Sequence, residues 1–94
     1  MVTELKPSNG RKSFGGKALM VSDKKHVALV SYGTVVCWTD ADLKLHRTWG
    51  GWSGTTGAHI QSFCDELGIP YKGKKDWTEL ATEEVPAWAA ILSR

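Results

Sequence analysis

The stretch WGGWSGTTGAHIQSFCDEL, residues 49–67, decides the fold of this chain. Its second half carries apolar residues at the spacing i, i+3, i+4 and i+7: Ile60, Phe63, Cys64 and Leu67. This spacing forms one face of an α-helix. Short hydroxyl side chains before it are natural N-caps, and Thr55 is the favoured one. Gly68 suits a left-handed C-terminal cap, with Ile69 closing over Cys64. The sequence therefore predicts a helix over about residues 55–67.

Length and charge limit the class of protein. The chain has 94 residues, of which 41% are hydrophobic, and this suits a single domain with a small core. The formal net charge is +2, with eight Lys/Arg against four Asp/Glu in residues 1–47 and four against six in residues 48–94. So small a charge does not by itself predict a nucleic-acid partner. With no signal peptide or membrane-spanning run in sight, we expect a soluble, cytoplasmic protein without a membrane partner.

The region before the helix reads as strands. It contains four short runs rich in β-branched and apolar residues, at 17–21, 26–32, 34–39 and 43–49. Such runs, separated by polar turns, are typical of strands. Gly33 is compatible with a turn or with a bulge in one long strand. A turn is favoured, because a 14-residue strand would be long for so small a domain.

Strands followed by helices indicate an α+β fold with an antiparallel sheet. We expect three or four strands within residues 17–49, packed on the main helix near 55–67. The predicted core consists of Ile60, Phe63, Leu67, Leu29, Val36 and Leu45. The chain is predicted to be one domain, 1–94, in which the polar residues 1–13 form a mobile arm. Residues 76–94 are expected to form short helical segments, with Asp76 as a helix cap.

The residues that bind metals or act as nucleophiles form no recognisable motif. They are His26, His46, His59, Cys37 and Cys64. No pair has the CxxC or HxxxH spacing of zinc ligands, and both cysteines read as reduced core thiols. His59, near the start of the helix, is expected to bond a backbone carbonyl and lock the strand–helix junction. The glycine-rich stretch lacks the GK[ST] and GxGxxG signatures of nucleotide loops. The sequence therefore predicts no metal, no cofactor and no enzyme.

The tryptophans suggest a binding surface. Five in a chain of this length are more than a small core hides, and exposed aromatic residues are frequent binding hot spots. Half-buried core anchors are an equally good reading of several of them. The predicted protein-binding residues are Arg47, Trp49 and Trp52. In the alternative reading, bases stack on the aromatic rings. The nucleic-acid contacts would then be Lys72, Lys74 and Lys75.

Four strings of the sequence together resemble a known family. They are SFGGKA (13–18), SYGTVV (31–36), WGGWSGTTGAHIQSF (49–63) and KKDW (74–77). They resemble the pattern SFxGKA, SYxTxV, WxG[YW]SxTTxHIxxF and KKxW of an uncharacterised family of small phage and mobile-element proteins. Gly15 stands where that family often has an aromatic residue, and Trp52 where it usually has Tyr. The resemblance implies no activity, only the setting of a small accessory phage protein.

The residues and the resemblance together favour a non-enzymatic interaction protein. We expect it to inhibit a host system, as an anti-CRISPR or other anti-defence protein, by blocking a surface. The expected partner is a host protein or ribonucleoprotein complex in the host cytoplasm. Two alternatives stay open: a nucleic-acid-binding accessory protein and a domain that sequesters a small ligand.

Overall fold

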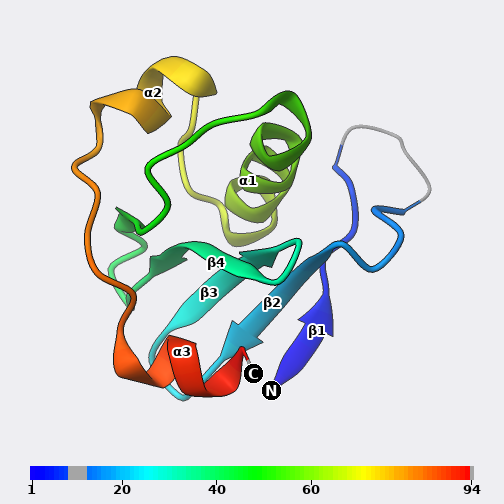
Figure 1. Ribbon diagram of the computed structural model, residues 1–94, viewed down its shortest axis with the longest axis vertical. Helices are drawn as coiled ribbons and strands as arrows, with labels where there is room; N and C mark the ends of the chain where they lie inside the picture. Colours follow the sequence, from blue (N-terminus) through cyan, green and yellow to red (C-terminus); the bar gives the residue numbers. More distant parts are fainter. Residues whose placement is uncertain (9–12, 94) are drawn as a thin grey trace.

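The computed structural model describes residues 1–8 and 13–93, which form an α+β fold. The strands described are β1 (Val2–Glu4), β2 (Ala18–Ser22), β3 (Val27–Ser31), β4 (Thr34–Thr39) and β5 (Leu45–Arg47). The helices described are α1 (Gly54–Leu67), α2 (Lys74–Glu79) and α3 (Ala87–Leu92). Figure 1 shows α1 above the sheet and α3 below it. In the described chain no helix is long and apolar enough to cross a membrane.

Within the described residues the sheet has five antiparallel strands in the order β1-β2-β3-β4-β5, so the prediction of three or four was too low. The additional strand, β1, lies in the segment expected to be a mobile arm. Its backbone pairs with β2, and Leu5 directly after it is buried in the core. One apolar side chain thus docks an otherwise polar segment. The rest of the expected arm includes residues 9–12, which lie outside the described residues.

The hairpin between β3 and β4 contains both a turn and a bulge. Tyr32 and Gly33 have φ angles of 50° and 79°, as a tight two-residue hairpin turn requires. The favoured reading of Gly33 as a turn is therefore correct. A bulge occurs further along β4: Leu29 pairs with Cys37 and Val30 with Val35, which leaves Val36 as one extra residue. A bulge bends its strand and increases the local twist.

The caps of α1 explain where this helix begins and ends. Ser53 is the N-cap, and its hydroxyl accepts a hydrogen bond from the backbone N–H of Thr56 at 3.1 Å. The favoured cap, Thr55, was two residues too late. At the other end Gly68 has a φ of 73°, and the Ile69 N–H donates to the Cys64 carbonyl at 2.8 Å. This is the predicted Schellman-type end.

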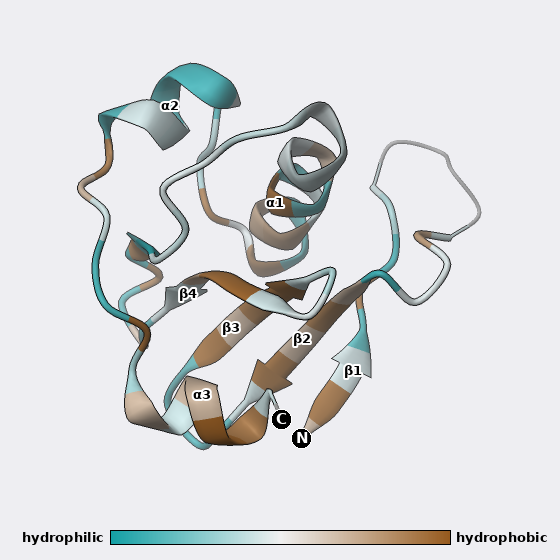
Figure 2. Ribbon diagram, viewed as in Figure 1, coloured by the Kyte–Doolittle hydropathy of each residue, from teal (hydrophilic) through white to brown (hydrophobic). Residues whose placement is uncertain are grey.

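The described core has two parts, one on each face of the sheet. Ile60 and Phe63 of α1 are fully buried in one cluster with Leu29 and Val36. The other cluster joins Ala89 of α3 to the opposite face, through Val21, Ala28, Val30 and Val35. Figure 2 shows the hydrophobic colour concentrated along β2, β3 and β4, between these helices. Leu67 and Leu45, predicted in the core, are only half-buried at its margin.

The C-terminal segment differs in detail from its prediction. Gly73 stands before the first residue of α2, while Asp76 lies inside the helix and accepts a hydrogen bond from the Lys72 N–H at 2.7 Å. Trp77 is fully buried, and its indole N–H donates to the Gly51 carbonyl at 2.7 Å. This bond ties α2 to the loop that leads into α1.

Candidate binding site

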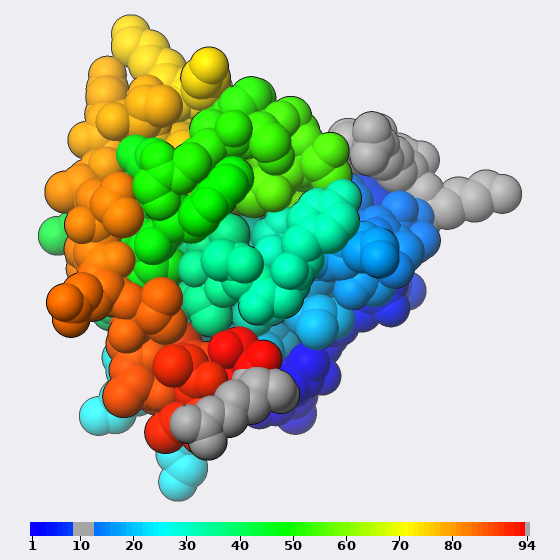
Figure 3. Space-filling model, viewed as in Figure 1, coloured from blue at the N-terminus to red at the C-terminus, as the bar shows by residue number. Residues whose placement is uncertain are grey.

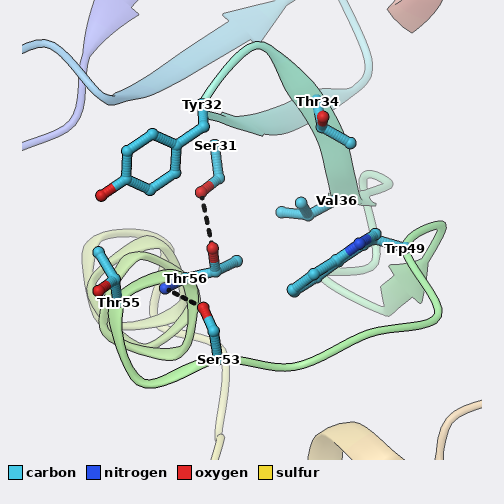
Figure 4. Close-up of a pocket in the computed structure, with 8 residues that line it drawn as sticks. All are labelled: Ser31, Tyr32, Thr34, Val36, Trp49, Ser53, Thr55 and Thr56. Atoms are coloured by element: carbon cyan, nitrogen blue, oxygen red, sulfur yellow. Dashed lines mark hydrogen bonds between the residues drawn. The ribbon is translucent and has the colours of Figure 1, made fainter.

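A pocket of about 370 Å³ opens beside the N-terminal end of α1. Its lining residues are Ser31, Tyr32, Thr34, Val36, Trp49, Ser53, Thr55 and Thr56. They come from the β3–β4 hairpin and from the loop and first turn of α1 (Figure 4). In the space-filling view these two regions lie side by side on one surface (Figure 3). We call the surface formed by residues 31–36 and 49–56 the pocket face.

Hydroxyl groups dominate the chemistry of the pocket. Six of the eight lining residues carry one, and the other two, Val36 and Trp49, form an apolar wall. Each hydroxyl can donate one hydrogen bond and accept others. The pocket can therefore match donors and acceptors of a partner in several arrangements.

The floor of the pocket is fixed by a buried polar network. The Ser31 hydroxyl lies 3.1 Å from the Thr56 hydroxyl and 2.8 Å from Nδ1 of His59. Ser31 and His59 are only 3% and 1% exposed. The sequence predicted a backbone carbonyl as the partner of His59, and the structure shows a side-chain partner from β3, the Ser31 hydroxyl. The network locks hairpin and helix together, which is the role foreseen for His59.

Tyr32 stands at the rim in an unusual conformation. It has a positive φ although it is not glycine, and its side chain is 57% exposed. A bulky residue in the left-handed region costs on the order of 1–2 kcal/mol. Asn or Gly would meet the same turn requirement with less strain. An exposed aromatic ring kept at such a position marks this rim as a candidate contact surface.

Trp49 and Trp52 both lie on the pocket face, and glycines explain their positions. A Cβ on Gly51 would come within 2.6 Å of the Trp49 ring, and a Cβ on Gly57 within 2.7 Å of the Trp52 ring. Each ring therefore packs directly on the backbone of a glycine, where any larger residue would clash with it. Trp49 is half-buried at the pocket wall, whereas Trp52 is 37% exposed. Only Trp52 of these two offers substantial surface to a partner.

Arg47 is not the exposed contact that the sequence suggested. It is 8% exposed. Its guanidinium donates to four backbone carbonyls: Trp49 at 2.9 Å, Gly50 at 2.8 Å, Trp77 at 3.1 Å and Leu80 at 3.2 Å. It also lies over the Trp77 ring, 4.9 Å from the centroid. These inward carbonyls hold its charge. It supports the pocket face from behind.

The three lysines of the alternative hypothesis lie on the surface, and one of them, Lys74, contacts Trp52. Lys72, Lys74 and Lys75 are all exposed. The Lys74 ammonium lies over the Trp52 ring at 5.1 Å from its centroid, a cation–π geometry. Part of the Trp52 ring is thus already in contact with Gly57 and Lys74, which leaves less of it for a stacked base.

The two cysteines are buried and free. Burial raises the pKa of the Cys37 thiol well above its ordinary value, and it raises that of Cys64 to about 12. Thiols of this kind are protonated at neutral pH and react poorly. Among the described residues no group of three or more His, Cys, Asp or Glu side chains could hold a metal ion.

A cluster of histidines and tryptophans on the α3 side was not foreseen from the sequence. The His46 ring stacks on Trp38 at 3.9 Å, and its two nitrogens face Asp40 at 3.2 Å and Glu83 at 3.0 Å. The hydrogen bond from His46 is the main reason that the pKa of Asp40 is lowered. Trp88 of α3 packs edge-on against Trp38. The cluster fastens the C-terminal segment to the sheet.

Fold and site define a small α+β domain with an open, hydroxyl-lined pocket between a hairpin and a helix. Residues 3–79 match a family of unknown function, DUF8033, so the chain belongs to that family. The match includes the whole pocket face and ends before α3. No curated protein and no solved structure matches the chain.

Sequence reasoning found part of this site and missed part of it. Trp49 does line the pocket, whereas Trp52 is not among the lining residues and packs against Gly57 and Lys74. Ser31, Tyr32 and Thr34 were not singled out as site residues, although the string SYGTVV drew attention for its resemblance. All eight lining residues fall within SYGTVV and WGGWSGTT. The signal was present, but only the fold brings the two strings together.

Proposed function

We propose that this protein is a small, non-enzymatic binding protein that occupies the surface of a partner through its pocket face. The observation that carries the proposal is the strained, exposed Tyr32 at the rim of the pocket, and Trp52 is a second exposed aromatic residue, on the loop that leads into α1. Exposed aromatic residues on a rigid support make good binding anchors. The support here is the buried Ser31–His59–Thr56 network and the Arg47 bonds behind the loop.

Burial of the reactive groups supports binding without turnover. Ser31 and His59 are hydrogen-bonded as a nucleophile and a base would be, yet both are almost fully enclosed. A catalytic serine has to reach its substrate. Cys37 and Cys64 are buried thiols with raised pKa values. We therefore assign Ser31 and His59 a structural role.

The narrower proposal is that the partner belongs to a host system which the protein inhibits. The resemblance to small phage and mobile-element proteins motivates it. The target would be a host protein or ribonucleoprotein complex in the host cytoplasm, with anti-CRISPR or other anti-defence activity. Expression in a host with an active defence system should restore phage plating. Wild-type protein without any such effect in a panel of defence systems would argue against inhibition.

The direct test of partner binding uses two matched variants. Tyr32→Gly removes the rim aromatic and also relieves the positive φ, so it should stay folded. Thr3→Val changes an exposed hydroxyl on the distant β1. A partner captured by wild type and Thr3→Val should be lost with Tyr32→Gly, and purified components should reproduce this. Trp52→Ala should weaken binding as well, once a thermal melt shows that it is folded. Equal capture by Tyr32→Gly and wild type would refute the proposed surface.

A second candidate function is binding of single-stranded nucleic acid. The contact between Lys74 and Trp52 favours it, since basic and aromatic side chains together form such sites. Binding should then weaken steeply with salt, and alanine at Lys72, Lys74 and Lys75 should flatten this dependence. A gel-shift series at low salt decides the matter. We expect weak, sequence-independent binding at most, because Trp52 is already partly covered.

A further inference from the structure

The pocket offers hydrogen bonds but no charge. The described residues that line it include no carboxylate, ammonium, guanidinium or imidazole group. An ion brought into such a site loses water without gaining a counter-charge, which is costly. A neutral group that both donates and accepts hydrogen bonds meets the hydroxyls of four exposed residues, Tyr32, Thr34, Ser53 and Thr55, which can do the same. The pocket therefore selects uncharged ligands.

The apolar wall adds a second requirement. Trp49 and Val36 form one side of the pocket, and in Figure 4 their side chains lie opposite Tyr32 and the hydroxyls of Ser31 and Thr56. A matching ligand has an apolar face and hydroxyl groups around its edge. A sugar ring has both, since its C–H bonds gather on the ring faces and its hydroxyls point outwards.

We propose that the pocket binds an uncharged, hydroxyl-rich ring, the neutral hexose unit of a free sugar or of a glycan. The inference rests on the pocket face being the binding site, as proposed above, and it names the ligand class of that site. A volume of about 370 Å³ lies in the range of small-molecule sites. A hexose has about twelve non-hydrogen atoms, so its dissociation constant should be on the order of 1–10 mM.

The experiment is a titration of ¹⁵N-labelled protein followed by NMR. The probes are glucose, galactose, mannose and N-acetylglucosamine, with glucuronate and glucosamine as charged counterparts. At least one neutral sugar should shift the Trp49 indole N–H and the amide signals of Thr55 and Thr56, and these shifts should saturate. The matching charged sugar should bind at least about tenfold more weakly. For a glycan as the source, a disaccharide should bind more tightly than its monosaccharide.

Isosteric variants then test whether the hydroxyls that line the pocket bind the sugar. Thr34→Val and Thr55→Val keep the side-chain shape at exposed positions and remove one hydroxyl each. Each should weaken sugar binding about fivefold, the effect of one neutral hydrogen bond. Thr3→Val on β1 should leave the affinity unchanged. Circular dichroism melts verify that all three variants are folded.

The inference is overturned if no neutral sugar gives saturable shifts up to about 50 mM, well above the expected dissociation constant. It is also overturned if a charged counterpart binds equally well, or if both threonine variants bind like wild type. The partner capture with Tyr32→Gly is a separate measurement. If sugars fail but Tyr32→Gly still abolishes capture, the ligand class is wrong and the proposed surface stands. If sugars bind while capture is unaffected, the partner uses another surface.

Discussion

The two faces of the sheet are built in different ways. The α1 face has a 14-residue helix with a side-chain N-cap and a left-handed C-cap, and the core cluster on this side contains eleven buried residues, three of them from α1 itself. The α3 face has a six-residue helix without a side-chain cap bond, and its cluster contains five buried residues. The family match includes α1 and ends before α3. The larger core cluster and the pocket thus lie on the α1 side of the sheet. The shorter helix α3 covers the other side and is held there by aromatic and charged contacts.

The largest expected effect is on the α1 face. Phe63→Ala should lower the free energy of unfolding by about 3–5 kcal/mol, because it removes a fully buried aromatic side chain and leaves a cavity. Urea denaturation measures this loss. Glu66→Ala, an exposed change on the same helix, should stay within about 0.5 kcal/mol of wild type. An unchanged midpoint for Phe63→Ala would remove this residue from the core.

Arg47→Lys should be the next in size. The lysine ammonium lacks the fork that reaches four carbonyls, and hydrogen bonds from charged groups contribute about 1.5–3 kcal/mol. We expect a loss of about 2–3 kcal/mol, with broadened NMR signals from the loop at 49–52. Lys44→Arg, at an exposed site just before β5, serves as control. A variant as stable as wild type would mean that Arg47 does not organise this loop.

Trp88→Ala tests the α3 face. Trp88 is half-buried and packs on Trp38 and His26, so its removal should cost about 1–3 kcal/mol, less than Phe63→Ala. The amides of α1 should keep their hydrogen-exchange protection. If the loss equals that of Phe63→Ala and the protection of α1 falls as well, the two faces do not differ as we describe.

The smallest effect concerns acid. The hydrogen bond from His46 lowers the pKa of Asp40 below its ordinary value of 3.8. A carboxyl group whose pKa is lower in the folded state stabilises the fold above its unfolded pKa and loses this effect as pH falls through the folded value. The melting temperatures of wild type and Asp40→Asn should therefore differ at about pH 5 and converge as the pH falls below the ordinary pKa value of 3.8. A constant difference between wild type and Asp40→Asn across this pH range would exclude this linkage.

The sequence predicted the α1 face better than the rest, for physical reasons. The apolar spacing of Ile60, Phe63 and Cys64, followed by Gly68, is a local pattern, and it defined the helix and its C-terminal end. The turn at Gly33 was also correct, because glycine next to a strand is a local signal. The strand β1 was missed, since Val2 and Leu5 are too few apolar residues to stand out in a polar segment.

The site was harder to predict, because it depends on pairing between distant segments. Arg47 was predicted to contact a partner, because the sequence does not show the backbone carbonyls that surround its guanidinium inside the fold. The carbonyls of Trp77 and Leu80 come from 30 and 33 residues away in the sequence. Tyr32 was not among the predicted binding residues, because its positive φ becomes visible only once the hairpin register is known.

The central claim, that partners bind at the pocket face and not at the α3 face, has one direct test. A photoreactive benzoylphenylalanine replaces either Tyr32 or Ile91, which are similarly exposed, at 57% and 59%, on the two faces. Both proteins are irradiated in living cells that express them, and adducts are identified by mass spectrometry. The account predicts a specific macromolecular adduct from position 32 and none from position 91. An adduct from position 91 alone, or from neither position, would contradict it.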